Sequence, residues 1–219
     1  MDSQVQELNN VWTALQSVAK FGGTSIMFLG VGVGDSASFC ARNFAQIAQN
    51  RANKAVWLLD LDFFNNGQYN ELTKIGANIS GPYDMTFGQK PFWRLSPANQ
   101  NVDLSSLLVA GRIDQSKLFV SRFRRDKLLN NQSIQIGPMP EYWAALRNSL
   151  DMVIVDAPSV DISRAGLALI SDMDGIVLVI DSVSSDAQDV AALRDEILQR
   201  GGNCLGAIMV NNSRSTSVA

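Results

Sequence analysis

Glycine, serine and alanine residues follow a short apolar segment in an arrangement that suits phosphate binding. Residues 25–29 are apolar and bounded by glycine, as in a buried parallel strand. Residues 38–49 then carry apolar side chains at helical spacing: Phe39, Cys40, Phe44, Ile47 and Ala48. Backbone N–H groups at a helix N-terminus bind anions, and glycines let the main chain approach them. The order strand, turn, helix therefore predicts a phosphate-binding loop with these members: Gly30, Gly32, Gly34, Ser36, Ala37 and Ser38.

The loop departs from both well-known phosphate-binding motifs. A dinucleotide fingerprint needs a third glycine where Asp35 stands, and a nucleoside-triphosphate loop needs a lysine where Ala37 stands. A strand-to-helix turn without any ligand, with Asp35, Ser36 or Ser38 as the helix cap, is the alternative to a degenerate nucleotide site.

Carboxylates follow two other apolar segments. Asp60 and Asp62 come after residues 55–59, and Asp156 comes after residues 152–155. Each alone also suits a helix cap, and the first pair also suits a ribose contact. Their joint placement at the carboxyl ends of strands favours metal and water positioning beside a triphosphate. If magnesium is bound, the expected ligands are Ser38, Asp60 and Asp156.

The rest of the chain repeats this alternation of strands and helices. Strands are expected at 175–180 and 207–210, and a helix at 186–200 with this apolar face: Val190, Leu193, Ile197 and Leu198. Such a pattern predicts one α/β domain over residues 1–219, with a mostly parallel sheet and helices on both faces. Within it we expect an N-terminal helix at 1–20, an irregular insertion-like segment at 76–140 and a polar tail at 213–219.

Composition excludes several kinds of chemistry and of partner. The chain has no histidine, so catalytic triads and histidine metal sites are excluded. Its two cysteines, Cys40 and Cys204, are expected to be buried reduced thiols, which favours a cytoplasmic setting. The net charge is −3, so no basic field attracts nucleic acid. The basic run at 122–127 suits a solvated edge better than an acidic partner, a lipid surface or a nucleic acid.

Several of these segments together resemble the cytoplasmic domain of bacterial tyrosine autokinases, in the deviant Walker branch of the P-loop ATPases. Residues 34–38 align with the family's Gly-Glu-Gly-Lys-Ser, residues 59–62 with its second acidic motif and residues 153–158 with its Walker B segment. The resemblance implies a P-loop fold, with metal and hydroxyl-activating roles for the aspartates at 60 and 62. It also places Asn211, at the end of a strand, against a nucleotide base.

Three features of the family are missing from this chain. Ala37 replaces the phosphate-binding lysine. The Glu-x-x-Arg-x-x-Arg motif of the family's ring contact begins at Glu7, but Asn10 and Thr13 replace both arginines. The tail has no tyrosine to accept a phosphate. Asp60, Asp62 and Asp156 are therefore interpreted as vestigial, and we expect either no cofactor or weak ATP or ADP binding with magnesium.

The resemblance implies a role in capsule, exopolysaccharide or adhesin synthesis, here as a kinase-like regulatory or scaffolding subunit without catalysis. Its expected partner is an inner-membrane chain-length regulator, a polysaccharide co-polymerase. The chain has no apolar stretch long enough to cross a bilayer, so it reaches the membrane only through that partner.

Two alternatives remain. The protein is an active ATPase or kinase if another lysine replaces the missing one, and the candidates are Lys20, Lys54, Lys74 and Lys90. Alternatively it is a septum-site or partitioning type of positioning protein, although neither an amphipathic tail helix nor the charge balance favours this.

Overall fold

The computed structural model describes residues 3–18, 22–32, 36–98, 102–182 and 185–210. The strands in these ranges are β1 Thr24–Val31, β2 Val56–Asp60, β3 Ile79–Asp84, β4 Trp93–Ser96, β5 Leu108–Ile113, β6 Leu118–Phe123, β7 Ser133–Ile136, β8 Met152–Ala157, β9 Gly175–Asp181 and β10 Cys204–Val210. The α-helices are α1 Ser3–Val18, α2 Ser36–Arg51, α3 Gly67–Lys74, α4 Pro140–Ser149 and α5 Ala187–Gln199. Three 3₁₀ helices are η1 Leu104–Ser106, η2 Arg125–Lys127 and η3 Gly166–Asp172.

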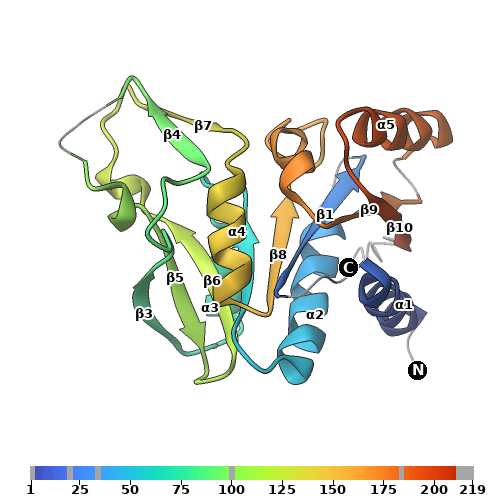
Figure 1. Cartoon of the computed structure of the whole chain (residues 1–219), viewed down its shortest axis with the longest axis horizontal. Coiled ribbons are helices and arrows are strands. Elements are labelled where there is room, and N and C mark those ends of the chain that lie inside the picture. Colours follow the sequence, from blue (N-terminus) through green and yellow to red (C-terminus); the bar gives the residue numbers. More distant parts are fainter. Residues whose placement is uncertain (1–2, 19–21, 33–35, 99–101, 183–184, 211–219) are drawn as a thin grey trace, which may run out of the picture.

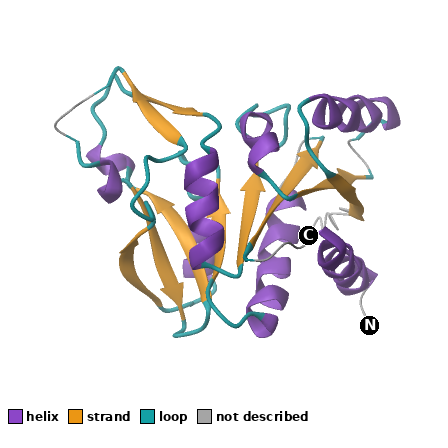
Figure 2. Cartoon of the chain, in the orientation of Figure 1, coloured by secondary structure: helices purple, strands orange, loops and turns teal. Residues whose placement is uncertain are grey.

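Eight strands form one central sheet in the order β10-β9-β1-β8-β2-β6-β5-β3 (Figures 1 and 2). The six strands from β10 to β6 pair in parallel, and β5 and β3 extend the sheet in antiparallel fashion. The expected α/β architecture with a mostly parallel sheet is therefore confirmed. β1 lies inside the sheet between β8 and β9, so the turn that follows it opens at the sheet's carboxyl edge.

Helices cover both faces of the sheet, and the sequence of β1 shows why. Ile26 and Phe28 point into a core shared with α1, α2 and α3, whereas Met27 and Leu29 point into a core shared with α4, η3 and α5. All four side chains are fully buried. Strands buried on both faces read as continuous apolar runs, which is how β1, β2, β8 and β9 appear in the sequence.

The segment 76–140 is more regular than the sequence analysis expected. It contains β3, β5 and β6, which extend the main sheet, and β4 and β7, which form a separate antiparallel pair. In Figure 1 these strands occupy the left part of the molecule, beside α4. The interpretation of this segment as irregular was therefore wrong.

Three side-chain expectations also need correction. Phe39 was placed on the apolar face of its helix but is 43% exposed, and Leu198 of α5 is 49% exposed. Cys40 is buried as expected, but Cys204 is only half-buried because it begins the edge strand β10. Both cysteines are free thiols.

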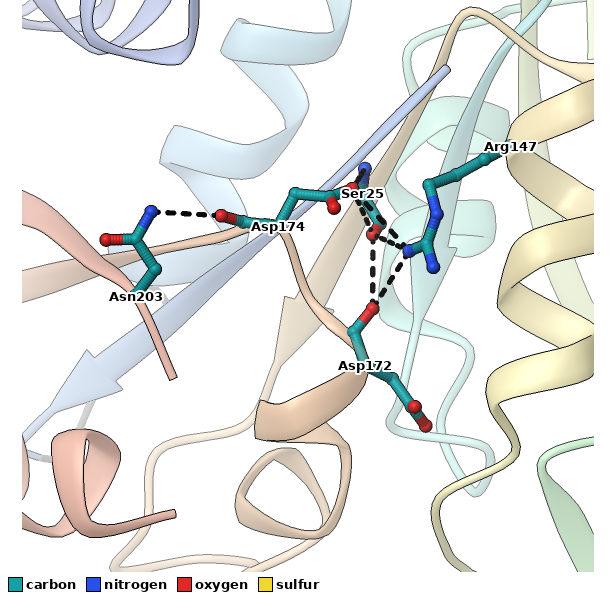
Figure 3. A network of polar contacts seen from close by, with 5 residues as sticks. All are labelled: Ser25, Arg147, Asp172, Asp174 and Asn203. Carbon is teal, nitrogen blue, oxygen red and sulfur yellow. Dashed lines mark hydrogen bonds and ion pairs between the residues drawn. The ribbon is translucent and has the colours of Figure 1, made fainter. Parts of the chain in front are cut away.

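A polar network fixes the amino end of β1, opposite the glycine-rich turn (Figure 3). Arg147 of α4 donates to Ser25 Oγ at 2.7 Å and to the Asp172 carbonyl at 3.0 Å. Asp174 accepts from the Ser25 backbone N–H at 2.8 Å and from its hydroxyl at 2.9 Å, and Arg147 lies 3.5 Å from the same carboxylate. This network holds together α4, β1 and the segment that leads into β9.

None of the helices in the described part of the chain has the length and apolar character of a membrane span.

Candidate functional site

The glycine-rich turn joins β1 to α2 at the carboxyl edge of the sheet. Gly30 and Val31 end β1, and Ser36 begins α2. Gly32 has a φ of +85°, a conformation that favours glycine. The Ser185 hydroxyl donates to the Val31 carbonyl at 2.6 Å, so the segment before α5 lies against this turn. The structure brings Gly30, Gly32, Ser36, Ala37 and Ser38 together, whereas Gly34, Asp35 and Asn211 lie outside the described residues.

Ala37, in the first turn of α2, is packed against the end of β1. Its side chain is 4% exposed. A Cβ placed on Gly30 would lie 3.4 Å from the Ala37 methyl group, so the first turn of α2 is closely packed against the end of β1. A methyl group at this position brings no positive charge to the turn.

Asp60 and Asp156 end two neighbouring strands and are paired in register. Both side chains are almost completely buried, at 4% and 3% exposure. Burial and the nearby charge of Asp156 raise the pKa of Asp60 to about 7, and hydrogen bonds from Gln68 and Asp62 oppose the shift. A carboxyl pair at this edge of an α/β sheet is what the sequence predicted.

Asp60 binds backbone groups of its own surroundings. Its Oδ1 accepts from the Asp62 N–H at 2.8 Å, and its Oδ2 accepts from the Gln68 N–H at 3.0 Å. Because Gln68 is the second residue of α3, the second bond satisfies a free N–H group at a helix start. The Ser121 hydroxyl accepts from the Asp60 backbone N–H at 2.8 Å, which ties β2 to β6.

Asp62 also stabilises a local turn. One of its oxygens accepts from the backbone N–H groups of Phe64 and Asn65, each at 3.1 Å, and the other accepts from the Asn65 side-chain amide at 2.6 Å. Both carboxylate oxygens therefore have partners in the loop between β2 and α3. This arrangement is an Asx turn that shapes the entry into α3.

Gln68 joins the parts of this site. Its side-chain nitrogen donates to Asp156 Oδ2 at 2.7 Å and to the Ser38 carbonyl at 2.8 Å. Its side-chain oxygen accepts from Arg42 of α2 at 2.9 Å. Gln68 is 1% exposed, so this amide lies within the site and not on its rim.

These contacts do not suit a magnesium ion. Magnesium takes oxygen ligands in octahedral geometry, and the three expected ligands are Ser38, Asp60 and Asp156. Here an amide N–H group faces Asp156 and Ser38, and Asp60 is bound to backbone N–H groups. Among the described residues, no group of three or more acidic or cysteine side chains is arranged to hold a metal ion.

The lysines considered as substitutes have other surroundings. Lys54 precedes β2 at the opposite edge of the sheet, where its ammonium donates to the Asn148 carbonyl at 3.2 Å. Lys74 pairs with Glu71 at the end of α3. Lys90 is exposed in the connection between β3 and β4, and Lys20 lies outside the described residues. The cation that does reach the site is the Arg42 guanidinium, through Gln68.

A groove of about 1010 Å³ opens beside the second acidic motif. Asp62 and Phe64 line it from the loop after β2, Trp93 lines it from β4, and Pro158 and Ile162 line it from the segment after β8. Phe64 and Ile162 are 51% and 64% exposed. The antiparallel pair β4 and β7 forms one wall of this groove.

Three residues of the site were not predicted from the sequence: Arg42, Gln68 and Ser121. All three act through hydrogen bonds that connect residues at least 26 positions apart in the chain. Their sequence neighbourhoods contain no motif that singles them out.

Neither the protein-family models nor the curated proteins include a match to this sequence. Solved structures do resemble it. The kinase domain of the Escherichia coli tyrosine kinase ETK superposes with a TM-score of 0.65 at 17% identity, covering 98% of this chain and 78% of that domain. The VpsO kinase domain gives a TM-score of 0.53 at 16% identity, covering 96% and 98%.

A third structure with this fold is a protein of another kind. The MinD cell division protein of Aquifex aeolicus gives a TM-score of 0.54 at 17% identity, covering 85% of this chain and 69% of MinD. The carboxylates at the strand ends and the glycine-rich turn lie at the sheet edge where the resemblance expected them. The chain therefore has the α/β fold of these kinase domains.

Proposed function

We propose that this protein is a kinase-like regulatory or scaffolding subunit without catalytic activity, which acts in bacterial polysaccharide synthesis and export. Its proposed partner is an inner-membrane chain-length regulator, a polysaccharide co-polymerase, which recruits it to the membrane from the cytoplasm. The fold likeness to bacterial tyrosine kinase domains supports the class of protein. The state of the nucleotide site supports the absence of catalysis.

The observation that carries the proposal is the buried methyl group of Ala37. A unit positive charge about 4 Å from a phosphate is worth roughly 4 kcal/mol at an effective dielectric constant of 20. Half of that value already weakens binding more than tenfold. Phosphoryl transfer depends even more strongly on fixed positive charge around the migrating group. ATP or ADP with magnesium is therefore expected to bind weakly or not at all.

The carboxylates support the same conclusion. Asp60 and Asp62 accept backbone hydrogen bonds that shape the start of α3, and Asp156 accepts the Gln68 amide. We propose that these residues, vestigial for catalysis, now stabilise the loop and helix beside them. Asn10 and Thr13 of α1 are exposed and bond within their own helix, so they do not replace the arginines of the family's ring contact.

The direct test is calorimetric titration of ATP and ADP with magnesium into the natural protein and into an Ala37→Lys, Ser36→Gly variant. We expect no heat of binding for the natural protein and measurable binding for the variant. Tight binding to the natural protein, with magnesium-dependent hydrolysis lost in Asp60→Asn, would instead support the alternative of an active ATPase.

A genetic test addresses the role in the cell. Deletion of the gene should change the length or the export of the polymer, and Asp156→Asn should restore it as well as the natural gene does, because Asn keeps an acceptor for Gln68. A strong defect of Asp156→Asn at normal protein level would contradict the scaffolding role.

The septum-site or partitioning alternative predicts binding to lipid vesicles or DNA in pelleting assays, and no described feature favours it.

A further inference from the structure

We propose that the Gln68 side chain occupies the place of the metal ion in this site and is the residue that keeps divalent cations out. The inference rests on the proposed function, because it assigns a residue to the loss of metal at the same site. The inference goes beyond the proposed function in one respect. It predicts that the contacts of Gln68 hold this site in one arrangement whether or not a ligand is bound.

The backbone N–H and both side-chain polar atoms of Gln68 have partners in the site. The backbone N–H donates to Asp60, the side-chain nitrogen donates to Asp156 and to the Ser38 carbonyl, and the side-chain oxygen accepts from Arg42. Three of these partners, Ser38, Asp60 and Asp156, are the residues that the kinase resemblance assigns to magnesium. Gln68 contacts Asp156 at its carboxylate, Ser38 at its main-chain carbonyl and Asp60 through its own backbone N–H. Its side-chain amide therefore takes up the Asp156 carboxylate oxygen that a metal ion would need.

The chemistry of the amide explains how it replaces a cation. A primary amide offers two N–H donors, and both are used here, toward one carboxylate oxygen and one carbonyl oxygen. These are the kinds of oxygen atom that otherwise bind magnesium. A metal ion would have to displace both N–H groups and leave the buried amide without acceptors, which is unfavourable.

Arg42 strengthens this exclusion. Its guanidinium donates to the oxygen end of the same amide, so a positive charge lies directly behind Gln68. The charge polarises the amide toward Asp156 and also repels a second cation from the site. The pair formed by Arg42 and Gln68 thus supplies from the protein itself the positive potential that a metal ion would supply.

The consequence is a site fixed by the chain alone. Gln68 connects α3 to the end of β8 through Asp156 and to α2 through Ser38 and Arg42, while its N–H connects α3 to the end of β2. In such a site the positions of α2 and α3 do not depend on nucleotide or metal. A surface built on these helices is then presented constantly, as a scaffolding subunit requires.

Manganese binding measured by electron paramagnetic resonance tests the inference. We expect the natural protein to bind no Mn²⁺ at up to 1 mM, roughly the weak end of biological affinities. The Gln68→Ala and Gln68→Glu variants should each gain one Mn²⁺ site with a Kd at least tenfold below this limit. Adding Asp156→Asn to either variant should remove that site again. Gln135→Ala is the matched control, because Gln135 also accepts from an arginine, Arg94, but on the exposed pair β4 and β7.

The natural protein also allows a test that needs no variant to fold. In NMR spectra, the Gln68 side-chain amide protons should be protected from solvent exchange, and their resonances should not change in 10 mM MgCl₂, a concentration of the order used to saturate weak magnesium sites. Rapid exchange, a shift with magnesium, or a folded Gln68→Ala variant that gains no Mn²⁺ site would each overturn the inference. Nucleotide binding and polymer phenotype are measured separately, so the proposed function is judged by other data.

Discussion

Asp60 and Asp156 are register partners at the carboxyl ends of β2 and β8, and both are buried. Two carboxyl groups placed in this way resist carrying a charge at the same time, because each raises the free energy of the other's ionised form. The pKa of Asp60 is raised to about 7 by burial and by this neighbour. The pair therefore makes the stability of the protein depend on pH in a range where most aspartates are fully ionised.

For this pH dependence, the sign follows from where the proton is bound. The folded protein holds a proton on Asp60 up to about pH 7, whereas an unfolded chain releases it near the ordinary aspartate pKa of about 4. The contribution of Asp60 to the free energy of unfolding is thus fully present below about pH 4 and is lost as the pH rises toward 7. The free energy of unfolding should fall by up to about 1.4 kcal/mol per pH unit in this window.

Urea unfolding at several pH values between 4.5 and 8 measures this slope. The difference between the natural protein and Asp60→Asn isolates the contribution of one group. Asp103→Asn serves as the control, since hydrogen bonds from Ser105 lower the pKa of Asp103 and move its titration below this window. A difference curve that stays flat with pH would contradict the raised pKa of Asp60.

Removal of the Arg147 guanidinium should destabilise the amino end of β1. Arg147→Met keeps the apolar stem but leaves Ser25, the Asp172 carbonyl and the Asp174 carboxylate without this donor. The expected loss is about 2 kcal/mol, which lowers the melting temperature by roughly 4–8 °C in a chain of this size. Arg94→Met, which removes a bond on an exposed surface, should change the melting temperature by less than about 2 °C.

Gly23 has no room for a side chain. A Cβ there would lie 2.1 Å from the Leu150 carbonyl oxygen and 2.8 Å from the Arg147 carbonyl oxygen, both of which belong to the backbone. Gly23→Ala should therefore cost about 3 kcal/mol or more, because backbone must move to relieve the overlap. Gly137→Ala, where a Cβ meets nothing within 4 Å, should be almost neutral. Calorimetric melting of both variants compares the two positions.

The two cysteines should react with thiol reagents at very different rates. Burial, together with the charges of Glu7 and Asp156, raises the pKa of the Cys40 thiol to about 12, so its reactive thiolate is scarce. Cys204 is half-buried on the edge strand β10. A chromogenic disulfide reagent should label Cys204 first and Cys40 only as the protein unfolds, and Cys204→Ser should lose the fast phase. Equal rates would mean that α2 opens readily.

Most of the parallel part of the fold could be predicted from sequence because its strands are buried on both faces. The exception is β6, which lies in the segment 76–140. β1, β2, β8 and β9 appear as unbroken apolar runs, and α2 and α5 show helical spacing between them. Strands β3 and β7 could not be recognised in this way, since most of their side chains are partly or fully exposed. The pairing of Trp93 with Ile136 also joins positions 43 apart, for which no local signal exists.

The sequence by itself determined the type of fold and the placement of Asp60 and Asp156 at strand ends. These are properties of short segments, in which periodicity and residue type are visible directly. Only the tertiary structure decided how the site is filled, because Gln68 comes from a helix whose sequence shows no motif and meets Ser38, Arg42 and Asp156 through the packing of α2 and α3 on one sheet face. Hydrogen bonds between distant segments depend on that packing, so no local pattern encodes them.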